Sequence, residues 1–309
     1  MKALGIENIY PNYHIICVDY TPLVDILEQQ GVSIFCYEKQ ADEINTLDRN
    51  TRKLLVQPEV QKYILDNSRD AVAIVMFKPN FNLQQVLKAS DLAEKRTVTS
   101  LNNHPRLASK LEDKLNFHNL CVESNISIPP TVVQSLHSIN YQNVANTLGE
   151  MFVIQFARGW FGNHTFFINS KDDLKVIKDK YTDRSVKISS YINGITLTNN
   201  AVIVGDKTLQ TYPFLQITDQ ENSLARLPGS SVGNAWGELH VTNANEVVME
   251  IKNYTEKIGS IINQQGYRGF FGLDFLVSDE GDVHVQELNA RFTASAFLMK
   301  KKEKEHTGT

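Results

Sequence analysis

The N-terminal third of the chain alternates between short apolar runs and segments with helical spacing. Apolar and β-branched residues gather at 13–20, 32–38 and 70–77, and residues 22–31 have helical spacing that ends at Gly31. Strands separated by helices of this length favour a parallel sheet covered by helices. A dinucleotide site of the Rossmann type needs a glycine-rich turn after the first strand, where this chain has DYTPL. We therefore expect an α/β domain without such a site.

The rest of the chain begins with a helical pattern and then becomes rich in strands. One long helix is predicted from His104 to about Asn125, because Pro129 and Pro130 prevent its continuation. A second helix is predicted over 243–266. Strand-like runs joined by Gly, Asn and Asp turns account for much of the remainder: residues 151–157, 164–170, 201–206, 269–281 and 282–292.

Composition narrows the class of protein without identifying it. The 309 residues are 42% hydrophobic and 21% charged, which is typical of a globular protein with two or three compact units. A net charge of −4 predicts no general attraction to nucleic acid or to anionic membranes. No segment has the cationic and apolar pattern of a leader peptide or the long apolar run of a membrane span.

The cysteines are sparse. Cys17, Cys36 and Cys121 form no CxxC pair, so neither a disulfide framework nor a thiolate zinc site is expected. A reducing cytoplasm fits this usage, and we expect a cytoplasmic protein.

The most informative polar residues lie near the C-terminus. Asp274 interrupts one apolar strand, and a turn leads to a second strand that carries Glu287 and Asn289. Residues two apart on a strand share a face, so these side chains should project together, with Arg291 beside them if the strand continues. Two carboxylates and an amide oxygen suit Mg²⁺ that carries nucleotide phosphates, and an arginine can stabilise a transferring phosphoryl group. A solvated strand face is the ordinary alternative.

A second polar feature is a glycine-containing loop between two predicted strands, residues 153–168. Gly159 and Gly162 would let backbone amides approach phosphate oxygens. The alternative is a plain hairpin turn. The loop lacks the GKS or GKT of a Walker A motif.

Together these pieces resemble the ATP-grasp family. LEDKLNF with Lys114, ARGWFGNHTF, SSYINGITLT and GLDFLV…VQELNARF occur in the family's order over roughly residues 105–295. The resemblance implies a parallel-sheet α/β domain followed by a two-subdomain ATP-grasp fold, an α/β and α+β architecture. The implied boundaries are 1–103, 104–193 with the phosphate loop, and 194–309 with the metal site. It places the chain near the carbamoyl phosphate synthetase and biotin carboxylase branch.

The resemblance also implies roles for individual residues. Asp274, Glu287 and Asn289 look like ligands of Mg²⁺, or of Mn²⁺ in its place, and Arg291 looks like the catalytic phosphate stabiliser. The residues that would contact ATP are Lys114, Gln155, Gly159, Gly162, Asn163, Ser189, Ser190, Tyr191, Ile192 and, at the ribose, Thr196 or Asn199.

Two positions depart from the family pattern. Gln155 stands where a lysine is usual, and Gln can donate a hydrogen bond but adds no charge. Arg158 or Lys187 is a candidate to compensate. Ser189 stands where the hinge usually has a carboxylate, which leaves backbone atoms to recognise adenine.

Candidates on the substrate side are weaker. Arg226 and Arg268 have the planar fork that matches a carboxylate, although each can equally be a surface arginine. Gly229, Gly233 and Gly237 lie in a polar loop that an acceptor could face. The isolated His104 and His164 are interpreted as structural or exposed.

Three functions remain open at this stage. The first is a ligase that activates a carboxylate with Mg-ATP and couples it to an amine or a short peptide, giving ADP and phosphate. The second is a bicarbonate-using or carbamoyl-phosphate-forming relative. The third, motivated by Gln155, is an ATP-binding regulatory module without turnover. A homodimer is compatible with each of them.

Overall fold

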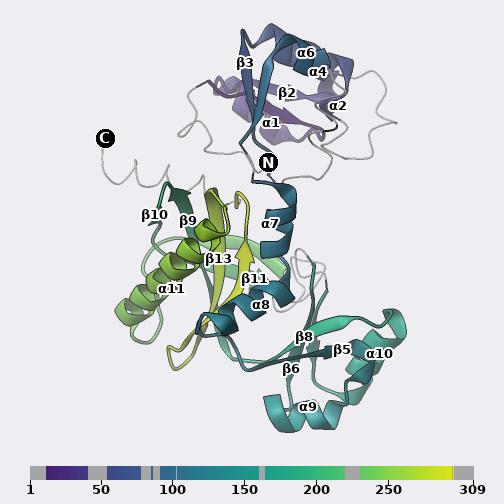
Figure 1. The fold of residues 1–309 in the computed structure, drawn as a ribbon, viewed down its shortest axis with the longest axis vertical. Coiled ribbons are helices and arrows are strands. Elements are labelled where there is room, and N and C mark those ends of the chain that lie inside the picture. The colour runs from purple at the N-terminus through teal and green to yellow at the C-terminus, as the bar shows by residue number, and fades with distance from the viewer. Residues whose placement is uncertain are drawn as a thin grey trace. The chain divides into compact units, whose positions relative to one another are not determined.

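The computed structural model describes residues 12–40, 54–77, 85, 91–101, 103–159, 164–219, 230–293 and 295. Two compact units make up the chain: Met1–Arg106 with Thr293–Thr309, and Leu107–Phe292. We call them the N-terminal unit and the grasp unit. Figure 1 shows the elements of both. Within the described residues, no helix has both the length and the apolar character that crossing a bilayer requires.

The N-terminal unit contains two pairs of parallel strands. β1 (Ile15–Cys17) pairs with β2 (Ile34–Cys36), and β3 (Ala71–Ile74) pairs with β4 (Thr97–Ser100). The helices between them are α1 (Pro22–Gln29), α2 (Tyr37–Gln40), α4 (Pro58–Asp66) and α6 (Asp91–Lys95). The parallel α/β pattern predicted from the apolar runs is thus confirmed. The strands are shorter than those runs, because only their centres pair.

The long helix predicted after His104 is two helices, so the sequence prediction was wrong there. α7 (Pro105–Leu111) ends, and α8 (Lys114–Glu123) starts anew after Asp113. The Asp113 carboxylate accepts hydrogen bonds from the backbone N–H groups of Leu115 and Asn116, which caps the new helix. The backbone N–H of Lys114 then donates to the carbonyl of Ala157. A local cap therefore overrides a continuous apolar period.

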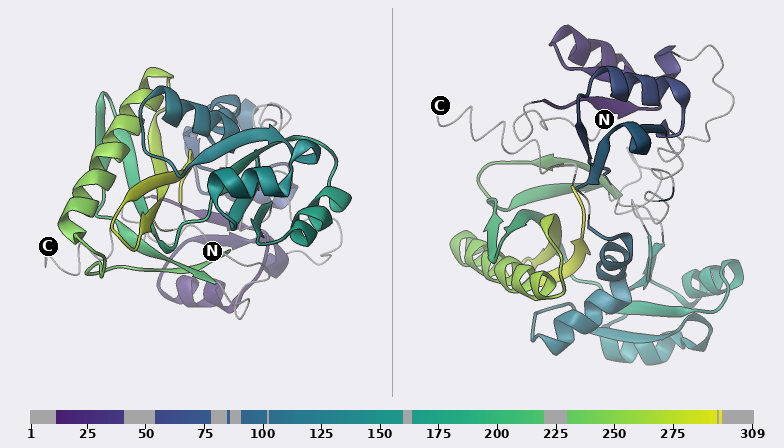
Figure 2. Two further views of the ribbon diagram at one scale, coloured as in Figure 1. Left: turned by 90° about the horizontal axis from the view of Figure 1, so that it is seen from below. Right: turned by 45° about the horizontal axis from the view of Figure 1, so that its top comes forward.

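A four-stranded antiparallel sheet follows, in the order β5-β8-β6-β7. Its strands are β5 (Thr131–Ser135), β6 (Phe152–Phe156), β7 (Thr165–Ile168) and β8 (Ser185–Ser190). A short 3₁₀ turn (Leu136–Ser138) follows β5, and α9 (Tyr141–Leu148) and α10 (Lys171–Lys180) cover one face of the sheet (Figure 2). Helix α10 was not predicted, because only Leu174 and Ile177 mark its buried side.

The two faces of this sheet differ in chemistry. Alternate residues of β6 and β8, including Phe152, Ile154 and Ile188, pack with α9 and α10 in one apolar cluster. The residues between them, such as Gln155 and Lys187, share the other face because successive strand residues point to opposite sides. We call this second face, which α9 and α10 do not cover, the open face, although Lys187 and Ser189 on it are buried.

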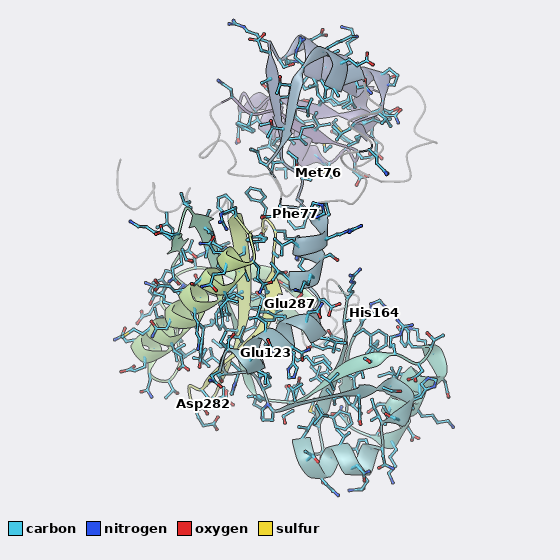
Figure 3. The ribbon with its side chains drawn as sticks, viewed as in Figure 1. Met76, Phe77, Glu123, His164, Asp282 and Glu287 are labelled. Carbon is cyan, nitrogen blue, oxygen red and sulfur yellow. The ribbon has the colours of Figure 1, made fainter. Side chains whose placement is uncertain are left out.

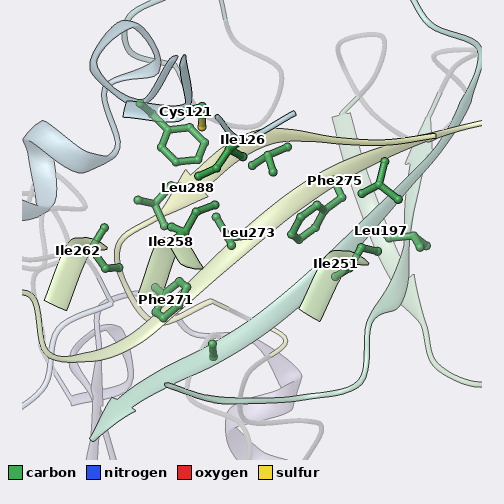
Figure 4. Packing of buried hydrophobic residues seen from close by; sticks show 14 of the residues in the cluster. Cys121, Ile126, Leu197, Ile251, Ile258, Ile262, Phe271, Leu273, Phe275 and Leu288 are labelled. Carbon is green, nitrogen blue, oxygen red and sulfur yellow. The ribbon is translucent and has the colours of Figure 1, made fainter. Parts of the chain in front are cut away.

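The remaining strands form a six-stranded sheet in the order β12-β11-β9-β13-β14, with β10 also paired to β9. The elements are β9 (Gly194–Val204), β10 (Lys207–Gln210), β11 (Phe214–Asp219), β12 (Ser230–Ala235), α11 (Ala244–Gln264), β13 (Gly269–Ser278) and β14 (Val283–Asn289). Ile251, Ile258 and Ile262 of α11 pack on Leu273 and its neighbours (Figure 4). The predicted helix over 243–266 is confirmed as α11.

Two boundaries differ from the sequence prediction. The strand expected at 201–206 is the second half of β9, an 11-residue strand whose polar first half hid it. β14 ends at Asn289 and does not reach Arg291. The C-terminal hairpin itself, β13 with β14, pairs antiparallel as expected.

Candidate functional site

The C-terminal hairpin brings its three oxygen-bearing side chains together. Asp274 and Glu287 are direct cross-strand partners. Asn289 is opposite Gly272, which lies two residues before Asp274 on β13. The Asn289 amide Nδ2 donates to Asp274 Oδ2 at 3.0 Å. Leu273, Phe275 and Leu288 occupy the opposite face, against α11. The polar residues therefore line the face of the sheet that α11 leaves uncovered.

Strand β9 adds a residue that the sequence analysis missed. Thr198 pairs with Asp274, and its hydroxyl donates to Asp274 Oδ1 at 2.8 Å. Thr196 lies two residues earlier and so shares this face. Asn199 lies on the opposite face, fully buried, and its amide donates to Gln210 and Thr255. Of the two ribose candidates, the geometry leaves Thr196 on the site face and assigns Asn199 to the core.

Two cationic side chains approach the hairpin, Lys114 from the start of α8 and Arg291 from the segment after β14. Lys114 Nζ lies 2.7 Å from Glu287 Oε2, and its side chain is buried. Glu287 is visible on β14 in Figure 3. Arg291 lies beyond the end of β14, so the expected extension of the strand was wrong. Its guanidinium pairs with Glu112, and its charge still stabilises the ionised form of Asp274.

The electrostatics of Asp274 fit a cation site. Burial, followed by repulsion from Glu287, raises its pKa from 3.8 to about 6, although hydrogen bonds from Thr198 and Asn289 oppose that rise. Two carboxylates that face each other remain ionised at neutral pH most easily when a cation lies between them. The described residues contain no cluster of three or more His, Cys, Asp or Glu side chains. A magnesium site here would therefore be two carboxylates and the Asn289 amide oxygen, a set of hard oxygen donors.

The open face of the four-stranded sheet carries two of the other predicted nucleotide residues, Gln155 and Ser189, and also Lys187. Gln155 on β6 is directly opposite Lys187 on β8, and the Gln155 amide donates to the Thr165 hydroxyl at 3.5 Å. Ser189 shares the face, with its hydroxyl 2.9 Å from that of Thr131. Burial, with repulsion from Lys114, lowers the pKa of Lys187 to about 8.

The connection from β8 to β9 is tightly packed. The backbone N–H groups of Ser190 and Tyr191 donate to the carbonyls of Pro130 and Met151, so these two donors are already engaged. Ile192 follows them. At Gly194 an added Cβ would lie 2.0 Å from the carbonyl oxygen of Val277. Only glycine allows the first residue of β9 to pair with β13 there.

A family model described as the ATP-grasp domain matches residues 111–295, more than half of the chain. The chain belongs to the ATP-grasp family. No curated protein matches the sequence significantly.

Solved structures share the ATP-grasp fold at low identity. D-alanyl-alanine synthetase A from Vibrio cholerae aligns with a TM-score of 0.57 and 16% identity, over 78% of this chain and 72% of that one. Phosphoribosylamine–glycine ligase from Thermotoga maritima aligns with a TM-score of 0.57 and 15% identity, over 89% of this chain and 68% of that one. A third structure is the biotin carboxylase domain of 2-oxoglutarate carboxylase from Hydrogenobacter thermophilus, solved with MgADP and bicarbonate. It aligns with a TM-score of 0.57 and 13% identity, over 91% of this chain and 64% of that one. At these identities the likeness concerns the fold.

Several residues expected to matter in an ATP-grasp site lie outside the described part of the chain. They are Gly162, Asn163, Arg226 and Gly229. Gly159 is described and lies three residues after the end of β6. Its neighbour Arg158 has Nε 3.9 Å from Asp113 Oδ2. That pair is exposed on the arginine side and therefore contributes little.

Two other candidate residues, Arg268 and His164, make contacts that support the fold. The Arg268 guanidinium donates to the carbonyls of Asn263 and Tyr267, which closes the end of α11. His164 has a left-handed backbone, with φ of 70°, and stacks on Phe156. That contact places the ring with the helix-covered face of the sheet and away from Gln155. The structural reading of His164 is favoured, and a substrate role for Arg268 gains no support from its contacts.

Proposed function

We propose that this protein is a ligase that uses Mg-ATP to activate a carboxylate as an acylphosphate and joins it to an amine, with release of ADP and phosphate. The observation that carries the proposal is the pairing of Asp274 with Glu287, with Asn289, Lys114 and Arg291 around them. Membership of the ATP-grasp family supports it. The roles of individual residues below are part of the proposal.

In this proposal residues 104–309 form two subdomains, 104–193 and 194–309, and residues 1–103 form the domain before them. Each of the two sheets in the grasp unit has its own apolar core, which supports the division. ATP would lie over the open face, with Thr196 at the ribose and the phosphates towards the hairpin. Tyr191 and Ile192 would border the adenine.

Asp274, Glu287 and Asn289 would hold Mg²⁺, or Mn²⁺ in its place, and the metal would neutralise phosphate charge. Lys114 would exchange part of its contact with Glu287 for a phosphate oxygen. Arg291, oriented by Glu112, would stabilise charge on the transferring phosphoryl group. Bound ATP would therefore replace interactions that the charged groups now make with one another.

The reaction has two steps. A substrate carboxylate oxygen attacks the γ-phosphorus, the bond between that phosphorus and the bridging oxygen breaks, and ADP leaves. The amine nitrogen then attacks the acyl carbon, phosphate leaves with the bonding electrons, and the nitrogen loses a proton to solvent or a base. Arg226 is our candidate for orienting the carboxylate.

The test follows ADP release against paired panels of carboxylates and amines, with Mg²⁺ and with EDTA, and with hydroxylamine added to trap an acylphosphate. Asp274→Asn and Glu287→Gln should abolish turnover. Asp279→Asn and Glu280→Gln, at the exposed turn of the same hairpin, are matched controls that should retain it. Wild-type turnover in both site variants would disprove this assignment of the site.

The departure at Gln155 favours one alternative, an ATP-binding module without turnover. Calorimetric ATP binding with no ADP production and no hydroxamate, across the whole panel, would support that alternative. A bicarbonate arm in the same panel tests the carboxylating reaction, for which ADP release should depend on bicarbonate alone.

A further inference from the structure

A buried lysine lies on the open face of the four-stranded sheet. Lys187 is 4% exposed, in the middle of β8. Among the described residues its ammonium group makes no hydrogen bond and no ion pair. An ammonium group removed from water without a partner is costly, and buried charges are normally paired or become neutral through a shift in pKa. An anionic ligand would supply the missing pairing.

The position of Lys187 gives it access to the same space as Gln155. The two residues are directly opposite in the antiparallel pair of β6 with β8, so their side chains leave the sheet on one face with Cβ atoms about 5 Å apart. A lysine has a flexible four-carbon stem. Its ammonium can therefore reach where a charged side chain at position 155 would reach.

The surroundings of Lys187 carry an excess of positive charge. Lys114, also buried, repels it, while Glu287 attracts it and is already in contact with Lys114. His118 lies one turn after Lys114 on α8, and its pKa is lowered first by burial and then by Lys187. The Nδ1 atom of His118 is buried and has no hydrogen-bond partner among the described residues. Two ammonium groups thus lie near one carboxylate, and among the described residues only Lys114 forms an ion pair with it.

We propose that Lys187 binds a phosphate group of the nucleotide, so that the charge missing at Gln155 is supplied from the neighbouring strand. The inference rests on the proposed function, because it takes the anion to be a nucleotide phosphate. Lys187 and Gln155 then act as a pair: Lys187 supplies the charge, and Gln155 supplies a neutral hydrogen bond to the same group. Lys114, held by Glu287, remains the second cation.

Calorimetric titration of the full-length protein with ATP and with adenosine tests the contact. Lys187→Met should weaken ATP binding by at least tenfold, because a charge-assisted hydrogen bond is lost. It should leave adenosine binding within about twofold, because adenosine has no phosphate. Lys175→Met, which removes an exposed lysine from α10, is the matched control and should bind both ligands as the wild type does. Equal losses for ATP and adenosine would show a structural role and overturn the inference.

Exchanging the lysine and the glutamine between the two strands provides the second test. Lys187→Gln combined with Gln155→Lys moves the ammonium one strand across and conserves the composition of the site. The double variant should recover most of the ATP affinity that Lys187→Gln alone loses. A double variant as weak as the single variant, in a protein that still binds adenosine, would contradict the proposal.

Thermal unfolding without nucleotide distinguishes binding from structural support. Lys187→Met should raise the melting temperature of the free protein, since it removes a buried charge that has no partner. A lower melting temperature together with weaker adenosine binding would overturn the inference. If the wild type itself binds no ATP, the proposed function fails and this inference with it. If the wild type and Lys187→Met bind ATP equally, only this inference fails.

Discussion

At the scale of single residues, the site holds like charges close together, which lowers the stability of the folded protein. Asp274 faces Glu287 across the hairpin, and Lys187 lies near Lys114. Burial and like charge raise the pKa of Asp274 to about 6 and lower that of Lys187 to about 8. Each shift means that the ionised form is less stable in the folded protein than in the unfolded chain. Perturbed groups of this kind are concentrated at functional sites.

Asp274→Asn should therefore separate activity from stability. A carboxyl whose pKa is raised on folding stabilises the fold most below its unfolded pKa, and that contribution is lost as the pH rises from about 4 to about 6. At pH 7 Asp274 is ionised in the folded protein, so the wild type is destabilised by the full cost of burying that charge. We expect the variant to lose turnover by at least 100-fold, because a neutral amide replaces one of the two anionic ligands, and to unfold in urea at the same or a higher midpoint at pH 7. A clearly lower midpoint would show that Asp274 supports the fold.

The lowered pKa of Lys187 predicts that the free energy of unfolding rises with pH. Because its pKa is lowered on folding to about 8 from an ordinary 10.5, the folded protein loses the proton first between these values. The unfolded chain then binds more protons, so the free energy of unfolding rises with pH in this interval through this group. Urea denaturation at pH 7.5 and 9.5 should show a larger increase for the wild type than for Lys187→Met. Equal increases would contradict the shift.

At the scale of elements, the cap of α8 positions Lys114. Asp113 holds the first turn by two hydrogen bonds, and Lys114 is the next residue. Asp113→Ala should cost about 1 kcal/mol of stability, as loss of an N-cap does, and should also raise the KM for ATP, since the first turn would fray. Asp113→Asn keeps an oxygen that can cap and is the control. If Asp113→Ala and Asp113→Asn have equal melting temperatures and equal KM values, the cap has no such role.

The start of β9 depends on one glycine. A methyl group at Gly194 would meet the carbonyl oxygen of Val277 at 2.0 Å, so β9 and β13 would have to separate. Gly194→Ala should destabilise the protein by about 3 kcal/mol or more. Gly233→Ala, where the nearest atom would be Ile217 Cδ1 at 3.7 Å on another strand, is the matched control and should be nearly neutral. Circular dichroism during thermal unfolding would measure both.

At the scale of the whole molecule, ligand binding should be visible as stability. Anything that binds only the folded state stabilises it by about 2.7 kcal/mol when present at 100 times its dissociation constant. Mg-ATP should thus raise the melting temperature of the full chain, and EDTA should remove most of that rise. In Glu287→Gln the magnesium-dependent part should disappear, while Glu280→Gln keeps it. An increase that is the same with EDTA would argue against a metal-dependent site.

The sequence was most informative where a local pattern and its pairing agree. The period of two in β13 and β14 places Asp274, Glu287 and Asn289 on one face, and a hairpin needs only a short turn to join them. The break between α7 and α8 was not predicted, because a single hydrogen-bonding side chain, Asp113, competes with a longer apolar period. The missed α10 has too few apolar residues to mark it.

The chain alone thus determines the family, the α/β pattern of the N-terminal unit, helix α11, and the face of the C-terminal hairpin that carries the acidic residues, since these follow from short-range spacing and from motif order. Only the tertiary structure decides that Thr198 bonds to Asp274, that Asn199 faces the core, that Arg291 pairs with Glu112 and that Lys187 is buried opposite Gln155. Each of these contacts joins residues from different strands or helices. Local periodicity indicates which face of a strand a side chain is on, whereas the residues that it contacts on another element also depend on turn geometry and packing.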